Sequence, residues 1–255
     1  MLTNYIFIPI AAAFIAYILN KQHKKAGAVI TALVSAYLLL SLTALYGRWD
    51  ITQSFNLSLM GYQIEFLLAV NPLSWLFAVM TASISILIAL FSINSQENFK
   101  FSSVFNLNFL IIIGSMLGIV FARDFLTLFI FWELMTWTSF YLISAGKKKM
   151  AGKAAFRYII LSAGAAYAFL MSSIIIFQQT GTFAFQNAAD FLLANSPVQS
   201  ILLLLAISLR LIVKAGIFPL HIWVKDAHGN APKEFSPFLS GMMLKIGIYG
   251  MLVVF

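Results

Sequence analysis

The architecture of this chain is evident from Phe105 to Ser144, which reads FNLNFLIIIGSMLGIVFARDFLTLFIFWELMTWTSFYLIS. This segment contains two apolar runs, at 105–122 and 124–144, with only Arg123 between them. A helix rises about 1.5 Å per residue, so about 20 apolar residues cross the roughly 30 Å hydrocarbon layer of a membrane. Each run therefore predicts one membrane-spanning helix.

The rest of the chain repeats this pattern. None of the other apolar runs alternates as a barrel strand would, and only helices or closed barrels satisfy their backbone groups in hydrocarbon. We expect an all-α, polytopic membrane helix bundle of about eight transmembrane helices, forming a single membrane domain over 1–255. Residues 1–100 supply helices 1 to 3, and residues 101–255 supply helices 4 to 8. The six further runs are Tyr5–Leu19, Ala26–Tyr46, Pro72–Ile93, Ala154–Phe177, Val198–Val224 and Pro237–Phe255.

The composition excludes several classes of protein. The 255 residues are 62% hydrophobic and 9% charged, which leaves too few polar groups for a water-soluble fold or a nucleic-acid partner. The absence of cysteine excludes disulfides and thiolate-held metal clusters. The sequence also lacks a phosphate-binding glycine loop, a dinucleotide motif and a nucleophile triad. We therefore expect no cofactor, no metal and no bond chemistry by this chain alone, with the lipid bilayer as its surroundings.

The formal net charge of +8 predicts the orientation of the chain. Short cytoplasmic loops of membrane proteins are rich in Lys and Arg. If the N-terminus lies outside, the outside loops hold only Arg48 and Arg123. We therefore predict a multi-pass protein of the inner or plasma membrane with its N-terminus outside. The eleven inside residues are Lys21, Lys24, Lys25, Lys100, Lys147, Lys148, Lys149, Lys153, Arg157, Lys225 and Lys233.

One segment between the second and third runs is not helical in pattern. Apolar and polar residues alternate at 55–59 and again at 62–66, with Met60-Gly61 between them. Alternation with a period of two indicates strands, and a short segment with glycine indicates a turn. We predict an external β-hairpin between helices two and three.

Four ionisable residues lie well inside the predicted spans, away from the loops and the break at Pro219: Glu133, Arg210, Lys214 and Lys245. A charge at mid-bilayer costs at least about 2.5 to 3.5 kcal/mol, so each is a candidate functional residue. Glu133, Lys214 and Lys245 fall at roughly one depth, which favours a lateral proton relay between helices. Two alternatives remain: ion pairs that only fix helix packing, and an Arg210 that pairs with a neighbouring carboxylate such as Glu133.

The seventh run carries a predicted break. Pro219 cannot donate to the carbonyl of Ala215, and Gly216 loosens the same turn. If the helix continues past the break, Arg210, Lys214 and His221 share one face. His221 and His228 could carry protons near neutral pH, whereas their spacing does not support a metal site.

Three stretches of the chain resemble a known family. They are FARDFLTLFIFWELM at 121–135, VKAGIFPLHIWVKDAHGNAP at 213–232 and FSPFLSGMMLKIGIYG at 235–250. The order and spacing of these stretches are similar to the antiporter-like membrane subunits of NADH-quinone oxidoreductase (respiratory complex I chains L, M and N). Large subunits of Mrp-type sodium/proton antiporters and of membrane-bound energy-converting hydrogenases belong to the same family.

The resemblance implies that Glu133 and Lys214 form a modulating pair and that Lys245 continues a proton or sodium path. Full family members have about fourteen helices in two inverted repeats, so this chain would hold only the first half-channel. The resemblance therefore implies that the chain is a fragment or that another membrane subunit completes the path. Two residues depart from the family pattern: Lys225 stands at a usual proline, and Arg210 adds a second cation.

The expected function is thus ion translocation within a respiratory, hydrogenase or Mrp-antiporter complex that contains other membrane subunits. The expected relay residues are Glu133, Lys214, Lys245, His221 and His228, with Arg210 and Pro219 modulating them. The alternative is a structural membrane subunit whose buried charges only support assembly. A stand-alone solute carrier is less compatible, because no aromatic cage or convergent polar cluster is evident.

Overall fold

The computed structural model describes residues 1–23, 25–59, 61–95 and 102–255. Within these residues, eight helices are long and apolar enough to cross a membrane, which confirms the predicted all-α membrane bundle. Lys24 and Lys100 of the predicted inside loops, and Met60 of the predicted hairpin turn, lie outside the described residues.

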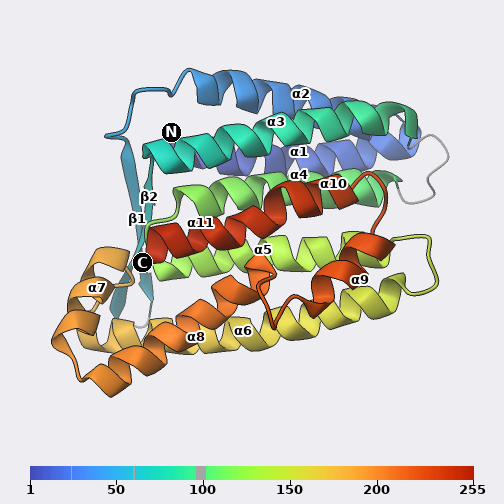
Figure 1. Ribbon diagram of the computed structural model, residues 1–255. Helices are drawn as coiled ribbons and strands as arrows, with labels where there is room; N and C mark the ends of the chain where they lie inside the picture. The colour runs from blue at the N-terminus through green and yellow to red at the C-terminus, as the bar shows by residue number, and fades with distance from the viewer. Residues whose placement is uncertain (24, 60, 96–101) are drawn as a thin grey trace.

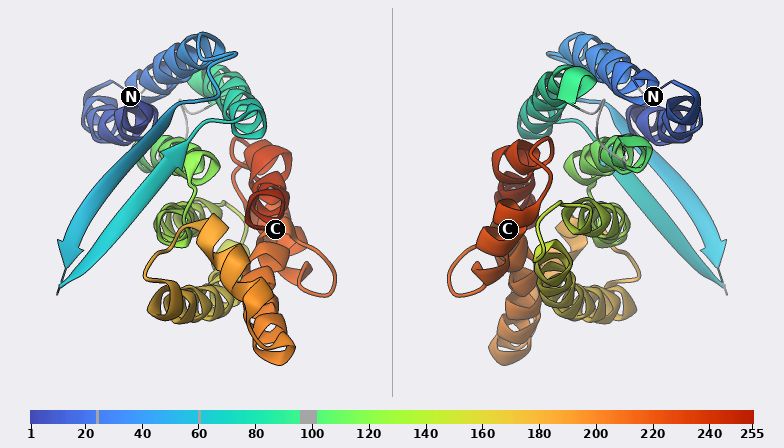
Figure 2. Two further views of the ribbon diagram at one scale, coloured as in Figure 1. Left: turned by 90° about the vertical axis from the view of Figure 1, so that its left-hand side faces the viewer. Right: turned by 90° about the vertical axis from the view of Figure 1, so that its right-hand side faces the viewer.

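The spanning helices run side by side and alternate in direction (Figure 1). Figure 2 shows the same helices nearly end-on. The last span combines a short α10, a π-helical turn over Leu239–Met243 and α11. The spans are α1 (Leu2–Gln22), α2 (Ala26–Thr43), α3 (Pro72–Ser95), α4 (Ser102–Phe121), α5 (Phe125–Ser144), α6 (Ala151–Thr180), α8 (Pro197–Ala215), α10 (Ser236–Phe238) and α11 (Leu244–Val254).

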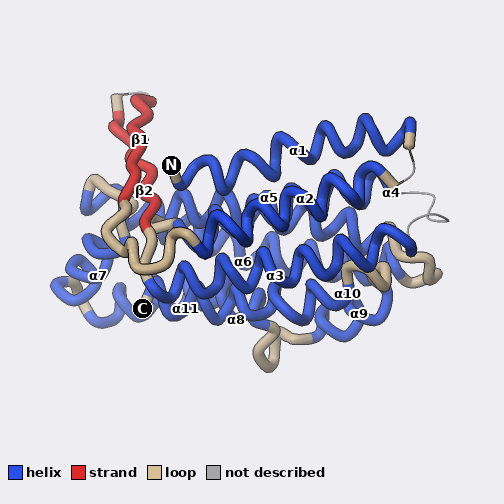
Figure 3. The backbone as a smooth tube through the Cα atoms, turned by 90° about the horizontal axis from the view of Figure 1, so that it is seen from above, coloured by secondary structure: helices blue, strands red, loops and turns tan. Residues whose placement is uncertain are grey.

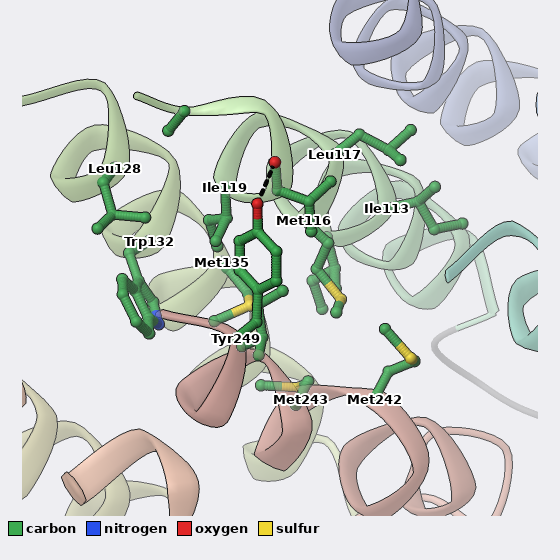
Figure 4. Packing of buried hydrophobic residues seen from close by; sticks show 14 of the residues in the cluster. Ile113, Met116, Leu117, Ile119, Leu128, Trp132, Met135, Met242, Met243 and Tyr249 are labelled. Carbon is green, nitrogen blue, oxygen red and sulfur yellow. Dashed lines mark hydrogen bonds between the residues drawn. The ribbon is translucent and has the colours of Figure 1, made fainter. Parts of the chain in front are cut away.

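Helix α4 is the most buried span of the described chain: fifteen of its twenty residues are buried. Glycines allow its neighbours to approach closely: a Cβ on Gly114 would lie 2.6 Å from the carbonyl oxygen of Ile6. Figure 4 shows the adjoining core, in which methionine and aromatic side chains from α4, α5 and the last span interdigitate. There the hydroxyl of Tyr249 donates to the carbonyl of Val120.

The predicted hairpin is present. Strands β1 (Thr52–Leu59) and β2 (Tyr62–Ala69) pair antiparallel, with Phe55 opposite Phe66, and each extends beyond the predicted alternation. Figure 3 shows both strands at the end of the bundle that also holds the two chain termini and α7 (Phe185–Ala194). The sequence did not predict α7, a ten-residue helix too short to span a membrane.

The short turn between α4 and α5 ties this end of the bundle together. Asp124 caps α5 by accepting from the amide of Thr127 at 2.7 Å, and it also accepts from the amide of Leu67 in β2 at 2.7 Å. The amide of Phe125 donates to the carbonyl of Phe183, which precedes α7. Burial raises the pKa of the Asp124 carboxyl above its ordinary value, while the hydrogen bonds from Thr127 and Leu67 oppose that rise. The start of α5 is therefore fixed from two sides.

The last span packs closely on α8 at Gly247 of α11. A Cβ at this position would lie 2.4 Å from the amide nitrogen and 2.7 Å from the Cα of Ala215. Backbone atoms cannot rotate away, so we expect Gly247→Ala to displace α11 and lower the unfolding free energy by about 1 to 3 kcal/mol. The measurement is thermal unfolding of the purified protein in detergent.

The matched control is Gly164→Ala in α6, where a Cβ meets no atom within 4 Å. This control should be as stable as the parent or slightly more stable, because alanine favours a helix more than glycine does. Equal unfolding temperatures for the two variants would contradict the close approach of α11 and α8.

Candidate functional site

An ion pair between Glu133 and Arg210 lies at the middle of the bundle. Glu133 lies midway along α5 and Arg210 belongs to α8. The guanidinium Nη2 donates to Glu133 Oε1 and lies 3.3 Å from Thr136 Oγ1, while Nη1 donates to the carbonyl of Ser162 in α6 at 2.5 Å. Arg210 is 1% exposed and the Glu133 side chain 22% exposed. One guanidinium thus links α5, α6 and α8.

Lys214 lies one turn beyond Arg210 on α8 and is also buried. Its Nζ donates to the hydroxyl of Tyr158 in α6 at 2.8 Å and lies 4.5 Å from the centre of that ring. Within the described chain, Lys214 makes no direct ion pair with a carboxylate. The structure therefore gives Glu133 the partner Arg210 rather than Lys214, which decides the pairing that the sequence left open.

Helix α8, which carries Arg210 and Lys214, ends inside the apolar run that was predicted as one span. Helix α8 stops at Ala215, Gly216 adopts a left-handed conformation with φ 65°, and α9 (Ile222–Asn230) begins six residues later. The indole of Trp223 donates to the carbonyl of Val213 at 2.8 Å, which satisfies one of the carbonyls freed by the break. Lys214 consequently lies in the last turn of a helix, where the helix dipole favours a cation.

Three predicted relay residues lie apart from this cluster. His221 is exposed beside Phe218, and because α8 ends at Ala215 it does not share a helix face with Lys214. Lys245 is exposed on α11, where its Nζ donates to the carbonyl of Ser240 at 2.5 Å.

His228 is exposed near the far end of the bundle, with its Nδ1 2.9 Å from the hydroxyl of Ser236. It lines a cavity of about 590 Å³ together with Lys147, Lys148 and Lys233. No group of three or more His, Asp or Glu residues in the described ranges could hold a metal ion.

Sequence reasoning missed Tyr158, Thr136 and Ser162 as parts of the site. Tyr158 is fully buried between α5, α8 and α9, and its ring packs against Trp223 with centroids 4.8 Å apart. A tyrosine within an apolar span was a usable signal, because a buried phenol hydroxyl needs a hydrogen-bond partner. Thr136 lies three residues after Glu133 and therefore on the same face of α5.

The chain is similar in sequence to a known family of membrane proteins. The sequence profile described as NADH:quinone oxidoreductase/Mrp antiporter, TM, matches residues 122–255. NADH-quinone oxidoreductase subunit M of Escherichia coli (strain K12) is 32% identical over 203 residues, covering 75% of this chain and 39% of that protein. A Na(+)/H(+) antiporter subunit of Alkalihalophilus pseudofirmus is 30% identical over 190 residues, covering 73% of this chain and 24% of that protein.

Among solved structures, the membrane-bound sulfane sulfur reductase, an archaeal respiratory membrane complex, contains a similar chain. The TM-score is 0.84 at 25% sequence identity, with 98% of this chain and 52% of that chain covered. The present chain thus spans about half of that structural neighbour and 39% of the Escherichia coli subunit. The profile match extends over the segment that holds Glu133, Tyr158, Arg210 and Lys214. This multi-pass membrane chain belongs to the NADH:quinone oxidoreductase/Mrp antiporter family.

Proposed function

We propose that this chain is an ion-translocating subunit of a membrane-bound respiratory, hydrogenase or Mrp-antiporter complex. The observation that carries the proposal is the cluster of the buried Arg210 and Lys214 with Glu133 beside the end of α8. Burying two cations beside a partly exposed carboxylate in a bundle of apolar spans is costly, and such groups commonly mark ion pathways. The transported ion is a proton or a sodium ion.

Each charged residue of the cluster has a different chemistry. Arg210 keeps its charge under all physiological conditions, so it can hold a carboxylate but cannot release a proton. Lys214 is a compact amine whose protonation responds to its surroundings. Glu133 has a partly exposed side chain and can take up or release a proton. Non-helical backbone next to Lys214 is tolerated at membrane depth where protein or water satisfies it, as in transporters.

Lys245 extends the proposed path toward the rest of an assembly. It lies two residues from Gly247, the position at which α11 packs on the end of α8 next to Lys214. Its exposed ammonium group would otherwise face lipid, so we infer that another membrane segment or subunit covers this face and continues the path. His221 and His228 remain proposed proton carriers on the exposed side of the break.

The proposed orientation places the N-terminus and the hairpin outside. The described Lys and Arg residues of the loops gather at the opposite end of the bundle, where α5 ends and α6 begins (Figure 1). At the hairpin end, Arg48 and Arg123 are the only described Lys or Arg residues in the connecting segments. This distribution supports a cytoplasmic location for the basic end.

The first test replaces the proposed ion carrier. Lys214→Met keeps the volume of the side chain and removes its charge, so the complex should assemble normally. We expect proton or sodium uptake by vesicles carrying the assembled complex to fall at least about tenfold, because a proton carrier has been lost. Lys149→Met, at an exposed loop position, is the control. Wild-type uptake by a fully assembled Lys214→Met complex would refute the proposal.

The second candidate function is that of a structural subunit. The observation that favours it is that Arg210, on α8, bonds to residues of both α5 and α6, so the ion pair holds three helices together. Glu133→Gln would leave a fully buried guanidinium without its carboxylate, which we expect to cost about 3 kcal/mol and to impair assembly. Arg210→Met should cost less, because the remaining Glu133 is partly exposed.

The double variant Glu133→Gln/Arg210→Met separates the two functions, since it removes both charges of the ion pair together. We expect it to regain assembly, measured by the amount of intact complex in the membrane, but not to regain ion uptake. An assembled double variant with wild-type uptake would show that the pair serves packing alone.

A further inference from the structure

The hydroxyl of Tyr158 is the only described hydrogen-bond partner of the Lys214 ammonium group. It lies on α6, fully buried, with the side chains of Thr136 and Ser139 on α5 beside it. A phenol hydroxyl can accept one hydrogen bond while it donates another. Among the described residues, Tyr158 is therefore the hydrogen-bonded group nearest to hand for a proton that leaves Lys214.

The polar atoms beyond Tyr158 continue to Glu133. Thr136 shares a face of α5 with Glu133, and the same guanidinium nitrogen of Arg210 contacts both side chains. Thr136 presently donates to the carbonyl of Trp132 at 2.7 Å. Rotation of the hydroxyl about the Cβ–Oγ1 bond would turn that donor away from Trp132, and the Glu133 carboxylate is bonded to the same guanidinium nitrogen that contacts Thr136.

Because Arg210 pairs with Glu133, this carboxylate does not accept a proton from Lys214 directly. The Arg210 guanidinium is fixed by the carbonyl of Ser162 and by Glu133, and it cannot pass on a proton itself. Proton transfer between Lys214 and Glu133 consequently needs other groups that can both accept and donate a proton. The hydroxyls of Tyr158 and Thr136 are the described groups placed to do so.

We propose that Tyr158 is the relay residue that carries protons between Lys214 and Glu133, with Arg210 as a positioning residue that makes this relay necessary. In one transfer the Lys214 ammonium gives a proton to the Tyr158 oxygen, and Tyr158 gives its own proton to Thr136. Thr136 in turn protonates the Glu133 carboxylate, so each hydroxyl gains one proton and loses one. The inference rests on the proposed ion translocation and adds a residue to it.

Tyr158→Phe is the direct test, because it removes the hydroxyl and keeps the ring that packs against Trp223. Because the buried Lys214 ammonium loses its described partner, we expect less complex to assemble, and the complex that does assemble to lose ion uptake at least about tenfold. The matched control is Tyr249→Phe, which removes another buried hydroxyl, the one bonded to the carbonyl of Val120. Because Tyr249 does not contact Lys214, its loss should leave uptake unchanged in the assembled complex.

A second measurement separates relay from packing. A ring-fluorinated tyrosine at position 158 keeps the hydroxyl but makes it more acidic, so a relay should change its rate of ion uptake at least about twofold. The same analogue at position 249 should have no effect. If Tyr158→Phe fails to assemble, this analogue decides: a changed rate supports the relay, and an unchanged rate overturns it.

The outcomes also distinguish this inference from the proposed function. Wild-type uptake in Tyr158→Phe, together with an inactive Lys214→Met, would overturn the relay and leave the proposed function in place. Wild-type uptake in both variants would refute the proposed function and the relay with it.

Discussion

The contact of Arg210 with Glu133 constrains the arrangement of every helix around the site. A guanidinium among apolar side chains is costly without hydrogen-bond acceptors, so α8 places Arg210 at the depth where α5 carries Glu133. The additional bond to the carbonyl of Ser162 brings α6 to the same depth. With α5, α6 and α8 placed in this way, Lys214 on α8 comes within hydrogen-bond distance of Tyr158 on α6.

The depth of Glu133 is set at the other end of its helix. Asp124 caps α5 and is bonded to the hairpin, so the first turn of α5 cannot slide along the bundle axis. Phe125 is held in addition by the segment before α7. The hairpin and α7 are therefore coupled mechanically to the carboxylate, although they lie at the edge of the molecule.

The end of α8 affects the surroundings of Lys214 in two ways. It provides a helix C-terminus whose carbonyl groups favour the ammonium, and it exposes backbone on which α11 packs through Gly247. Trp223 satisfies one freed carbonyl and packs on Tyr158, so the segment after the break supports the same cluster. A lysine in a continuous helix would have neither arrangement.

Local sequence was enough to locate the eight spans, the hairpin and the four ionisable residues within the spans, because hydropathy, helix rise and strand alternation act along the local chain. It could not decide whether Arg210 or Lys214 reaches Glu133. These two cations are four residues apart on one helix face, so the choice depends on the axial position of α8 relative to α5, which only packing fixes. The exposure of Lys245 and the role of Tyr158 depend on tertiary structure for the same reason: whether a side chain faces the site or the surroundings is set by the rotation of its helix against its neighbours.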